Sequence, residues 1–160
     1  MRARQFCPIT CKCHEPRSSL SLGLPNEGCG TSCYRSGGFL ERLKATPCLD
    51  VQKDDPEWQD LVEHFKKSSA KWPSDWRYSA QVFADDMMKF GCGFFNSTNL
   101  TFGTPYFTNI NFCAESSTWY PIKPLSYFCP VACGCRKGDP HCPDSCPIRN
   151  ESEPLCPSYQ

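Results

Sequence analysis

The octapeptide FCPVACGC at residues 128–135 holds the cysteine signature that decides the fold of this chain. The chain carries this signature twice. Residues 6–13 read FCPITCKC, with the same phenylalanine, proline and three cysteines in the same places. Each copy is followed by two further cysteines at C-x3-C spacing, which are Cys29 and Cys33 after the first copy and Cys142 and Cys146 after the second. A signature that returns together with its downstream cysteines indicates duplicated modules.

The composition is that of a disulfide scaffold. Fourteen of the 160 residues are cysteine, and 15 prolines and 10 glycines favour loops. Lysine plus arginine balance aspartate plus glutamate at 17 each, so charge gives no argument for a nucleic-acid or anionic-membrane partner. No apolar run reaches the roughly 18 residues of a membrane span. We predict a small disulfide-rich fold of short helices and irregular loops, with little strand, stapled by its cysteines.

Three N-x-[ST] sequons, at Asn96, Asn99 and Asn150, are candidate glycosylation sites. Together with the cysteine density they favour a secreted protein or the extracellular face of a membrane protein. Residues 1–5 lead into the first signature without the apolar region of a signal peptide. We therefore expect the sequence to be a piece of a longer protein whose signal peptide lies upstream. A cytosolic protein with reduced or metal-bound thiols is the alternative.

Alignment of the two signatures divides the chain into modules. Residues 1–33 are predicted to be the C-terminal tail of a preceding module, and 34–47 a linker that contains a pair of glycines. Residues 48–146 form a complete module, and 147–160 a linker in which Cys156 can start a further module. The complete module holds an even set of cysteines that can all pair with one another, namely Cys48, Cys92, Cys113, Cys129, Cys133, Cys135, Cys142 and Cys146. The five cysteines of residues 1–33 cannot all pair among themselves.

Two helices are predicted in the front half of this module. Asp54 or Asp55 can cap a helix with Pro56 in its first turn, and its apolar face would consist of Trp58, Leu61, Val62 and Phe65. The second helix runs from Ser74 or Asp75 to Phe90, and Gly91 ends it. Asp85 and Asp86 are expected to face solvent. Residues 92–128 favour short strands or ordered loops.

The signature C-P-x-x-C-x-C has its own geometry. Proline suits the first turn of a helix, which would put Cys129 and Cys133 on one face. Cys133 and Cys135 are too close to bond to each other without strain, so each needs a different partner. A metal site that includes His14 or His141 is the competing hypothesis. The spacing is a poor match to the paired knuckles of structural zinc sites, so the disulfide scaffold is favoured.

An opening Cys-x-Asp at residues 48–50, a tryptophan-bearing middle and the closing cysteine cluster resemble the ShK-like toxin domain. That six-cysteine module is named for a sea-anemone potassium-channel blocker. The likeness covers the two ends of residues 48–135, and the interior is longer than is usual in the family. The last cysteine, Cys135, is one residue nearer to the cysteine before it than the family's usual spacing. The pairing that the resemblance implies is Cys48–Cys135, Cys92–Cys129 and Cys113–Cys133, which leaves Cys142 for Cys146.

The resemblance implies either an accessory module of a larger secreted protein or a channel plug, in which a lysine beside an aromatic residue enters the channel mouth. Here Lys123 is followed by a proline, and Tyr127 lies four residues on. Trp119, Tyr120 and Tyr127 could stack on a sugar, although a core role is favoured.

No residue cluster identifies a reaction, so we predict no enzyme activity and no cofactor. We predict a structural or adhesive repeat module that binds an extracellular protein or glycan and contacts neighbouring repeat modules. A metal-binding cysteine-rich protein is one alternative. The other is a potassium-channel-directed domain or an accessory module of a secreted enzyme.

Overall fold

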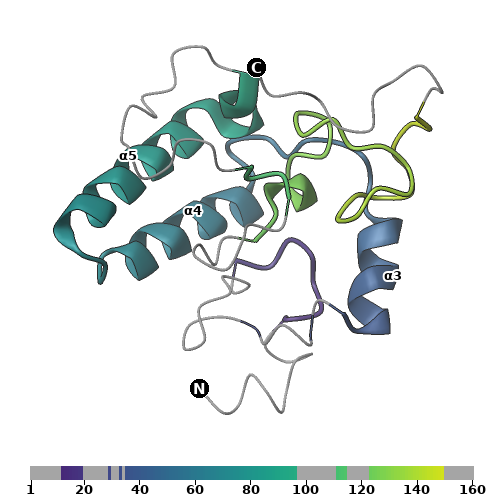
Figure 1. Cartoon of the computed structure of the whole chain (residues 1–160), viewed down its shortest axis with the longest axis horizontal. Coiled ribbons are helices and arrows are strands. Elements are labelled where there is room, and N and C mark those ends of the chain that lie inside the picture. The colour runs from purple at the N-terminus through teal and green to yellow at the C-terminus, as the bar shows by residue number, and fades with distance from the viewer. Residues whose placement is uncertain are drawn as a thin grey trace.

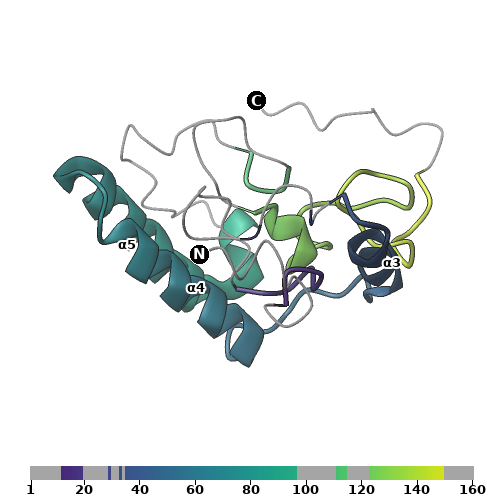
Figure 2. The same ribbon diagram turned by 90° about the horizontal axis from the view of Figure 1, so that it is seen from below.

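The computed structural model describes residues 12–19, 29, 33, 35–96, 111–114 and 123–149. Its helices are α3 (Gly37–Ala45), α4 (Pro56–Ser69) and α5 (Ser74–Phe90), followed by the short 3₁₀ helices η1 (Gly91–Asn96) and η2 (Leu125–Tyr127). Helices α4 and α5 lie side by side, while α3 stands apart at the other end of the molecule (Figures 1 and 2). No strand occurs among these residues, and disulfides join the loops. The predicted cysteine-stapled helical fold is confirmed.

Helix α4 begins where the sequence predicts. The Asp55 carboxylate accepts a hydrogen bond of 2.8 Å from the Glu57 backbone N–H, and Pro56 occupies the first helical position. Lys66 and Lys67 lie in the last turn, where cations favour the helix dipole. The predicted apolar face is buried. The local cap and the burial of the apolar face thus both stabilise this helix.

Helix α5 also has the predicted bounds, and Gly91 ends it with a φ of 57°. A Cβ at Gly91 would lie 3.0 Å from the Cβ of Lys53, so the chain needs glycine there for space as well as for conformation. Asp85 is exposed and pairs with Lys66 of α4 at 2.7 Å. The expectation that Asp86 faces solvent was wrong, because Asp86 is only 8% exposed. It lies three residues after the buried Phe83, on the flank of the same helical face.

The core is largely aromatic. Phe83 contacts the rings of Phe65, Phe94 and Phe112, whose centroids lie 5.5, 5.4 and 4.5 Å away. Trp58 packs edge-on against Phe128 and donates its indole N–H to the Met87 carbonyl at 3.1 Å. Each fully buried large apolar side chain contributes roughly 1.5–3 kcal/mol. The core therefore joins the helix pair to the closing cysteine cluster.

The predicted linker at residues 34–47 is wrong, because it contains α3. The Ser36 hydroxyl accepts a hydrogen bond from the Phe39 backbone N–H, and the two glycines occupy the first turn. Phe39 and Leu43, at i and i+4, are buried in the common core, and Phe39 is 1% exposed. Glycine disfavours helix formation locally, but Phe39 packs against Tyr127 with ring centroids 5.6 Å apart, and Leu43 belongs to the same core. Tertiary packing decides this helix.

None of the helices among the described residues has the length and apolar character to cross a bilayer.

We expect Phe39→Ala to lower the free energy of unfolding by about 3–5 kcal/mol, because it empties a packed aromatic site. Leu40→Ala is the matched control, since Leu40 is on the same helix and is 42% exposed; its effect should stay within about 0.5 kcal/mol. Urea unfolding of the oxidised chain measures both. Equal, small effects would contradict the placement of α3 in the core.

Candidate functional site

The closing cluster forms a single helical turn with a glycine-based end. The Cys133 backbone N–H donates to the Cys129 carbonyl at 2.9 Å. The Cys135 N–H then bonds to the Pro130 carbonyl at 2.8 Å and the Gly134 N–H to the Val131 carbonyl at 2.9 Å, with Gly134 at a φ of 68°. This is the hydrogen-bond pattern of a Schellman motif. It turns the chain sharply, so that Cys133 and Cys135 reach different partners.

Asp50 caps the other end of the same turn. Its carboxylate accepts hydrogen bonds from the backbone N–H groups of Val131 at 2.8 Å and Ala132 at 3.1 Å. The Val51 N–H donates to the Phe128 carbonyl at 2.9 Å. A carboxylate that takes unpaired N–H groups at the start of a helical turn stabilises that turn. The opening Cys-x-Asp therefore has a structural task more than 80 residues away in sequence.

All eight cysteines of residues 48–146 pair with one another. The bonds are Cys48–Cys146, Cys92–Cys129, Cys113–Cys133 and Cys135–Cys142. The middle two agree with the pairing that the family resemblance implied, but Cys48–Cys135 and Cys142–Cys146 are wrong. Ser145 reinforces the observed pairing: its hydroxyl donates to the Thr46 carbonyl at 3.0 Å and accepts from the Cys48 N–H at 2.8 Å. These bonds hold Cys48 beside Cys146.

The first signature follows the same pairing rule where the structure describes it. Cys13 bonds to Cys29, as the aligned Cys135 bonds to Cys142. Lys12 has a φ of 54°, in the place where Gly134 has 68°. Cys33, which aligns with Cys146, is free. Cys7, Cys11 and Cys156 lie outside the described residues. The described parts of the two signatures thus share one disulfide and one residue in the left-handed conformation.

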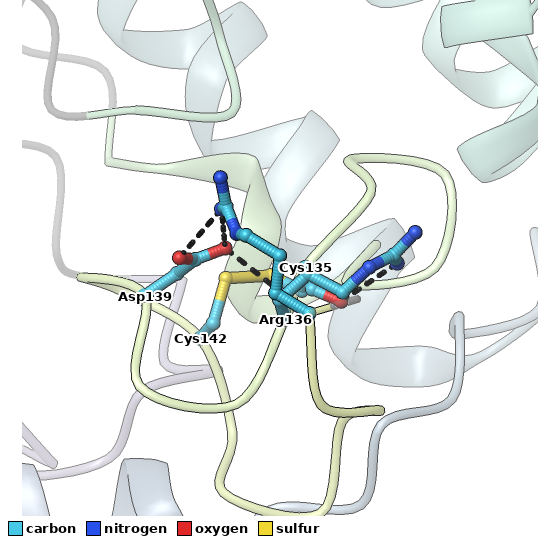
Figure 3. Close-up of polar contacts among 5 residues, drawn as sticks. Cys135, Arg136, Asp139 and Cys142 are labelled. Carbon is cyan, nitrogen blue, oxygen red and sulfur yellow. Dashed lines mark hydrogen bonds and ion pairs between the residues drawn. A yellow bond between two sulfur atoms is a disulfide. The ribbon is translucent and has the colours of Figure 1, made fainter. Parts of the chain in front are cut away.

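The Cys135–Cys142 bond closes a short loop, residues 135–142, which we call the closed loop (Figure 3). The Asp139 N–H donates to the Arg136 carbonyl at 3.1 Å, and Gly138 has a φ of 88°, as in a type II turn. The Asp139 carboxylate accepts from the Arg136 N–H at 3.1 Å and pairs with Arg149 at 2.8 Å. The loop is closed by a disulfide, a turn and a carboxylate at once.

The closed loop is also tied to the core. Nδ1 of His141 and the hydroxyl of Tyr127 share a hydrogen bond of 2.9 Å. The Ser126 hydroxyl donates to the His141 carbonyl at 3.0 Å, and the Lys137 N–H donates to the Pro147 carbonyl at 2.9 Å. Lys137, Gly138 and Pro140 remain exposed. The loop thus presents a few side chains from a restrained backbone, which suits recognition.

Lys123 is buried, with 3% of its surface exposed. Its Nζ donates to the Ser18 carbonyl at 3.1 Å and lies 5.3 and 5.2 Å from the ring centroids of Tyr127 and Phe128. Burial lowers the pKa of Lys123 well below its usual value; Glu57 and Glu15 oppose this shift and Arg17 adds to it. Lys123 and Tyr127, which are not adjacent in the sequence, therefore lie close together in space, but both are buried inside the protein.

Residues 12–19, which we call the N-terminal strap, cover this lysine. Arg17 donates to the Tyr127 carbonyl at 3.0 Å and to the Leu49 carbonyl at 3.2 Å. Glu15 pairs with Arg42 of α3 at 2.6 Å. The strap thus contacts both the predicted linker and the predicted module. The described part of residues 1–33 is packed on the fold that follows it.

The remaining predicted sites are placed as follows. Asn99 and Asn150 lie outside the described residues, as do Trp119 and Tyr120, and Asn96 is the last residue of η1. Tyr127 is a core residue. Among the described residues no group of three or more potential ligands could hold a metal ion. The closed loop was missed by sequence reasoning, although the C-x6-C spacing around Gly138 was a usable signal.

Comparison of the chain with protein-family models, with curated proteins and with solved structures finds no match.

We expect Asp50→Ala to lower the free energy of unfolding by about 1–2 kcal/mol, because two N–H groups of the closing turn lose their acceptor. Asp50→Asn should cost less, since its amide oxygen can still accept. Asp54→Ala, at an exposed aspartate close by, is the control and should change little. The measurement is denaturant unfolding with the disulfides intact; equal values for Asp50→Ala and Asp54→Ala would disprove the capping role.

The lowered pKa of Lys123 makes stability depend on pH. Between its lowered value and 10.5 the unfolded chain holds the proton and the folded chain does not, so the free energy of unfolding should rise with pH in that window. Lys123→Met removes this slope and should be at least as stable as the parent near neutral pH. Unfolding of both proteins at a series of pH values below 10.5 measures it, with Lys67→Met at an exposed lysine as control. Parallel pH profiles would contradict the buried lysine.

Proposed function

We propose that this chain is an extracellular, disulfide-stapled repeat module with a structural or adhesive role, and that it binds a protein or glycan through the closed loop. The observation that carries the proposal is the loop itself. A disulfide, a turn and the Tyr127–His141 contact restrain it, while Lys137, Gly138 and Pro140 are exposed. A backbone ordered before binding loses little entropy when a partner docks.

The disulfides support the extracellular part of this proposal. Ten described cysteines are joined in five bonds, and such bonds persist mainly in oxidising compartments. The sequons at Asn96, Asn99 and Asn150 fit the same route. The strap on the following module supports a role in a repeat array, in which adjacent modules pack against each other. The relation to the ShK-like toxin domain remains part of the proposal, and the Asp50 cap gives its Cys-x-Asp opening a physical reason.

Two alternatives are weaker. A channel plug needs an exposed lysine that can extend into a pore. Lys123 is instead buried under the N-terminal strap, where it donates a hydrogen bond to the Ser18 carbonyl. A metal-binding cysteine protein needs free thiolates, whereas the cysteines of the closing cluster are bonded in pairs. These contacts favour a binding module over both.

The proposal predicts saturable binding of the oxidised chain to the surface of intact cells or to extracellular matrix. Reduction and alkylation should abolish binding, because the loop loses the bond that closes it. Titration of a fluorescently labelled chain onto cells and matrix measures this, with the reduced and alkylated chain as control. Absence of saturable binding, or equal binding by the two forms, would refute the proposed function.

A further inference from the structure

The tip of the closed loop carries opposite charges on either side of one glycine. Lys137 and Asp139 flank Gly138 in the turn. Lys137 is exposed, and among the described residues no ion-pair partner is found for its ammonium group. Asp139 pairs with Arg149 and not with Lys137. The turn therefore presents an exposed ammonium group and, on the other side of the glycine, a partly exposed carboxylate whose ion-pair partner is Arg149.

We propose that the Lys137-Gly138-Asp139 tip binds a cell-surface protein whose site combines a bound divalent cation, for the Asp139 carboxylate, with an acidic pocket, for the Lys137 ammonium group. This inference rests on the proposed function and names the partner's chemistry. Divalent cations such as Ca²⁺ and Mg²⁺ take carboxylate oxygens as ligands. An acidic pocket supplies acceptors for the three donors of an ammonium group.

The Asp139 carboxylate can still accept such a cation. One of its oxygens accepts from Arg149, and the other from Arg149 and the Arg136 N–H. A carboxylate has about four acceptor positions, so one position remains. The side chains of Arg149 and Asp139 are 26% and 30% exposed. Partly exposed ion pairs contribute little to stability, so a partner's cation can displace Arg149 and gain further positions.

The turn holds the tip ready for docking. The Arg136 N–H keeps one Asp139 oxygen in place, and the Pro147 carbonyl holds the Lys137 backbone. Nothing lies within 4 Å of a Cβ built on Gly138, so its side is open to a partner, while its φ of 88° requires glycine. The disulfide closes the loop without the side chain of Lys137, whereas the Asp139 carboxylate both helps to close the loop and lies at its tip.

The test is adhesion of cultured cells to the immobilised full-length chain, in buffer with Mg²⁺ and Mn²⁺ and in buffer with EDTA. We expect adhesion to need the divalent cation and to be inhibited by the free linear peptide RKGDP, the sequence of residues 136–140. Asp139→Asn should lower adhesion about tenfold or more. Lys137→Gln should also lower it, and Lys137→Arg should restore it. Asp85→Asn, at another aspartate in an ion pair, should have no effect.

Arg149→Ala separates recognition from a structural role of Asp139. If the carboxylate binds a cation, removal of its competitor leaves adhesion unchanged or raises it. If Asp139 only maintains the loop, Arg149→Ala and Asp139→Asn reduce adhesion together, and the inference is overturned. Disulfide mapping and the melting temperature show whether each variant folds.

Saturable adhesion that persists in EDTA and in Asp139→Asn would overturn this inference and leave the proposed function in place. Absence of any saturable adhesion or binding would overturn both.

Discussion

The helical turn at residues 129–135 is the feature on which the rest of the structure depends. It carries three cysteines within seven residues, and they bond to Cys92, Cys113 and Cys142. A turn that directs cysteines toward three partners must hold its own shape. Asp50 satisfies the N–H groups at its start, and Gly134 allows the left-handed residue at its end. One carboxylate and one glycine thus organise three covalent links.

The aromatic core and the disulfides stabilise different aspects of the fold. The core fixes α4, α5 and α3 around Tyr127 and Phe128 through burial. The disulfides act chiefly on the unfolded chain, whose entropy they reduce, and a longer loop gains more. Cys48–Cys146 closes a sequence separation of 98 residues and Cys135–Cys142 only 7. The long bond joins the ends of the module, whereas the short one shapes the closed loop on its surface.

The N-terminal strap packs across the predicted module boundary at residue 48. Arg17 and Lys123 make polar contacts across more than 100 residues of sequence, and α3 packs into the core that follows it. In the repeat array that we propose, contacts of this kind would join adjacent modules in place of free linkers. Lys137, Gly138 and Pro140 of the closed loop remain exposed beside these contacts.

Predictions from the sequence succeeded where neighbours in the chain decide the structure. The caps and apolar periodicity of α4 and α5 are local, so Asp55, Pro56 and Gly91 gave correct helix ends. The pairing of Cys48 could not be predicted, because its partner Cys146 lies 98 residues away in the sequence and only the fold brings the two together. Helix α3 was missed for the same kind of reason. Its two glycines look like a linker, and the burial of Phe39 and Leu43 adds to the Ser36 cap to make the segment helical.

The sequence by itself determined the class of the fold, the repeated signature and the two long helices, because these follow from residue types and short-range spacing. Only the tertiary structure decided the burial of Lys123, the task of Asp50 and the exposure of the closed loop. Each of these depends on which segments meet in space. A lysine such as Lys123 is expected at the surface from its residue type alone. The strap that covers it, held by Arg17 and Ser18, puts it inside the protein.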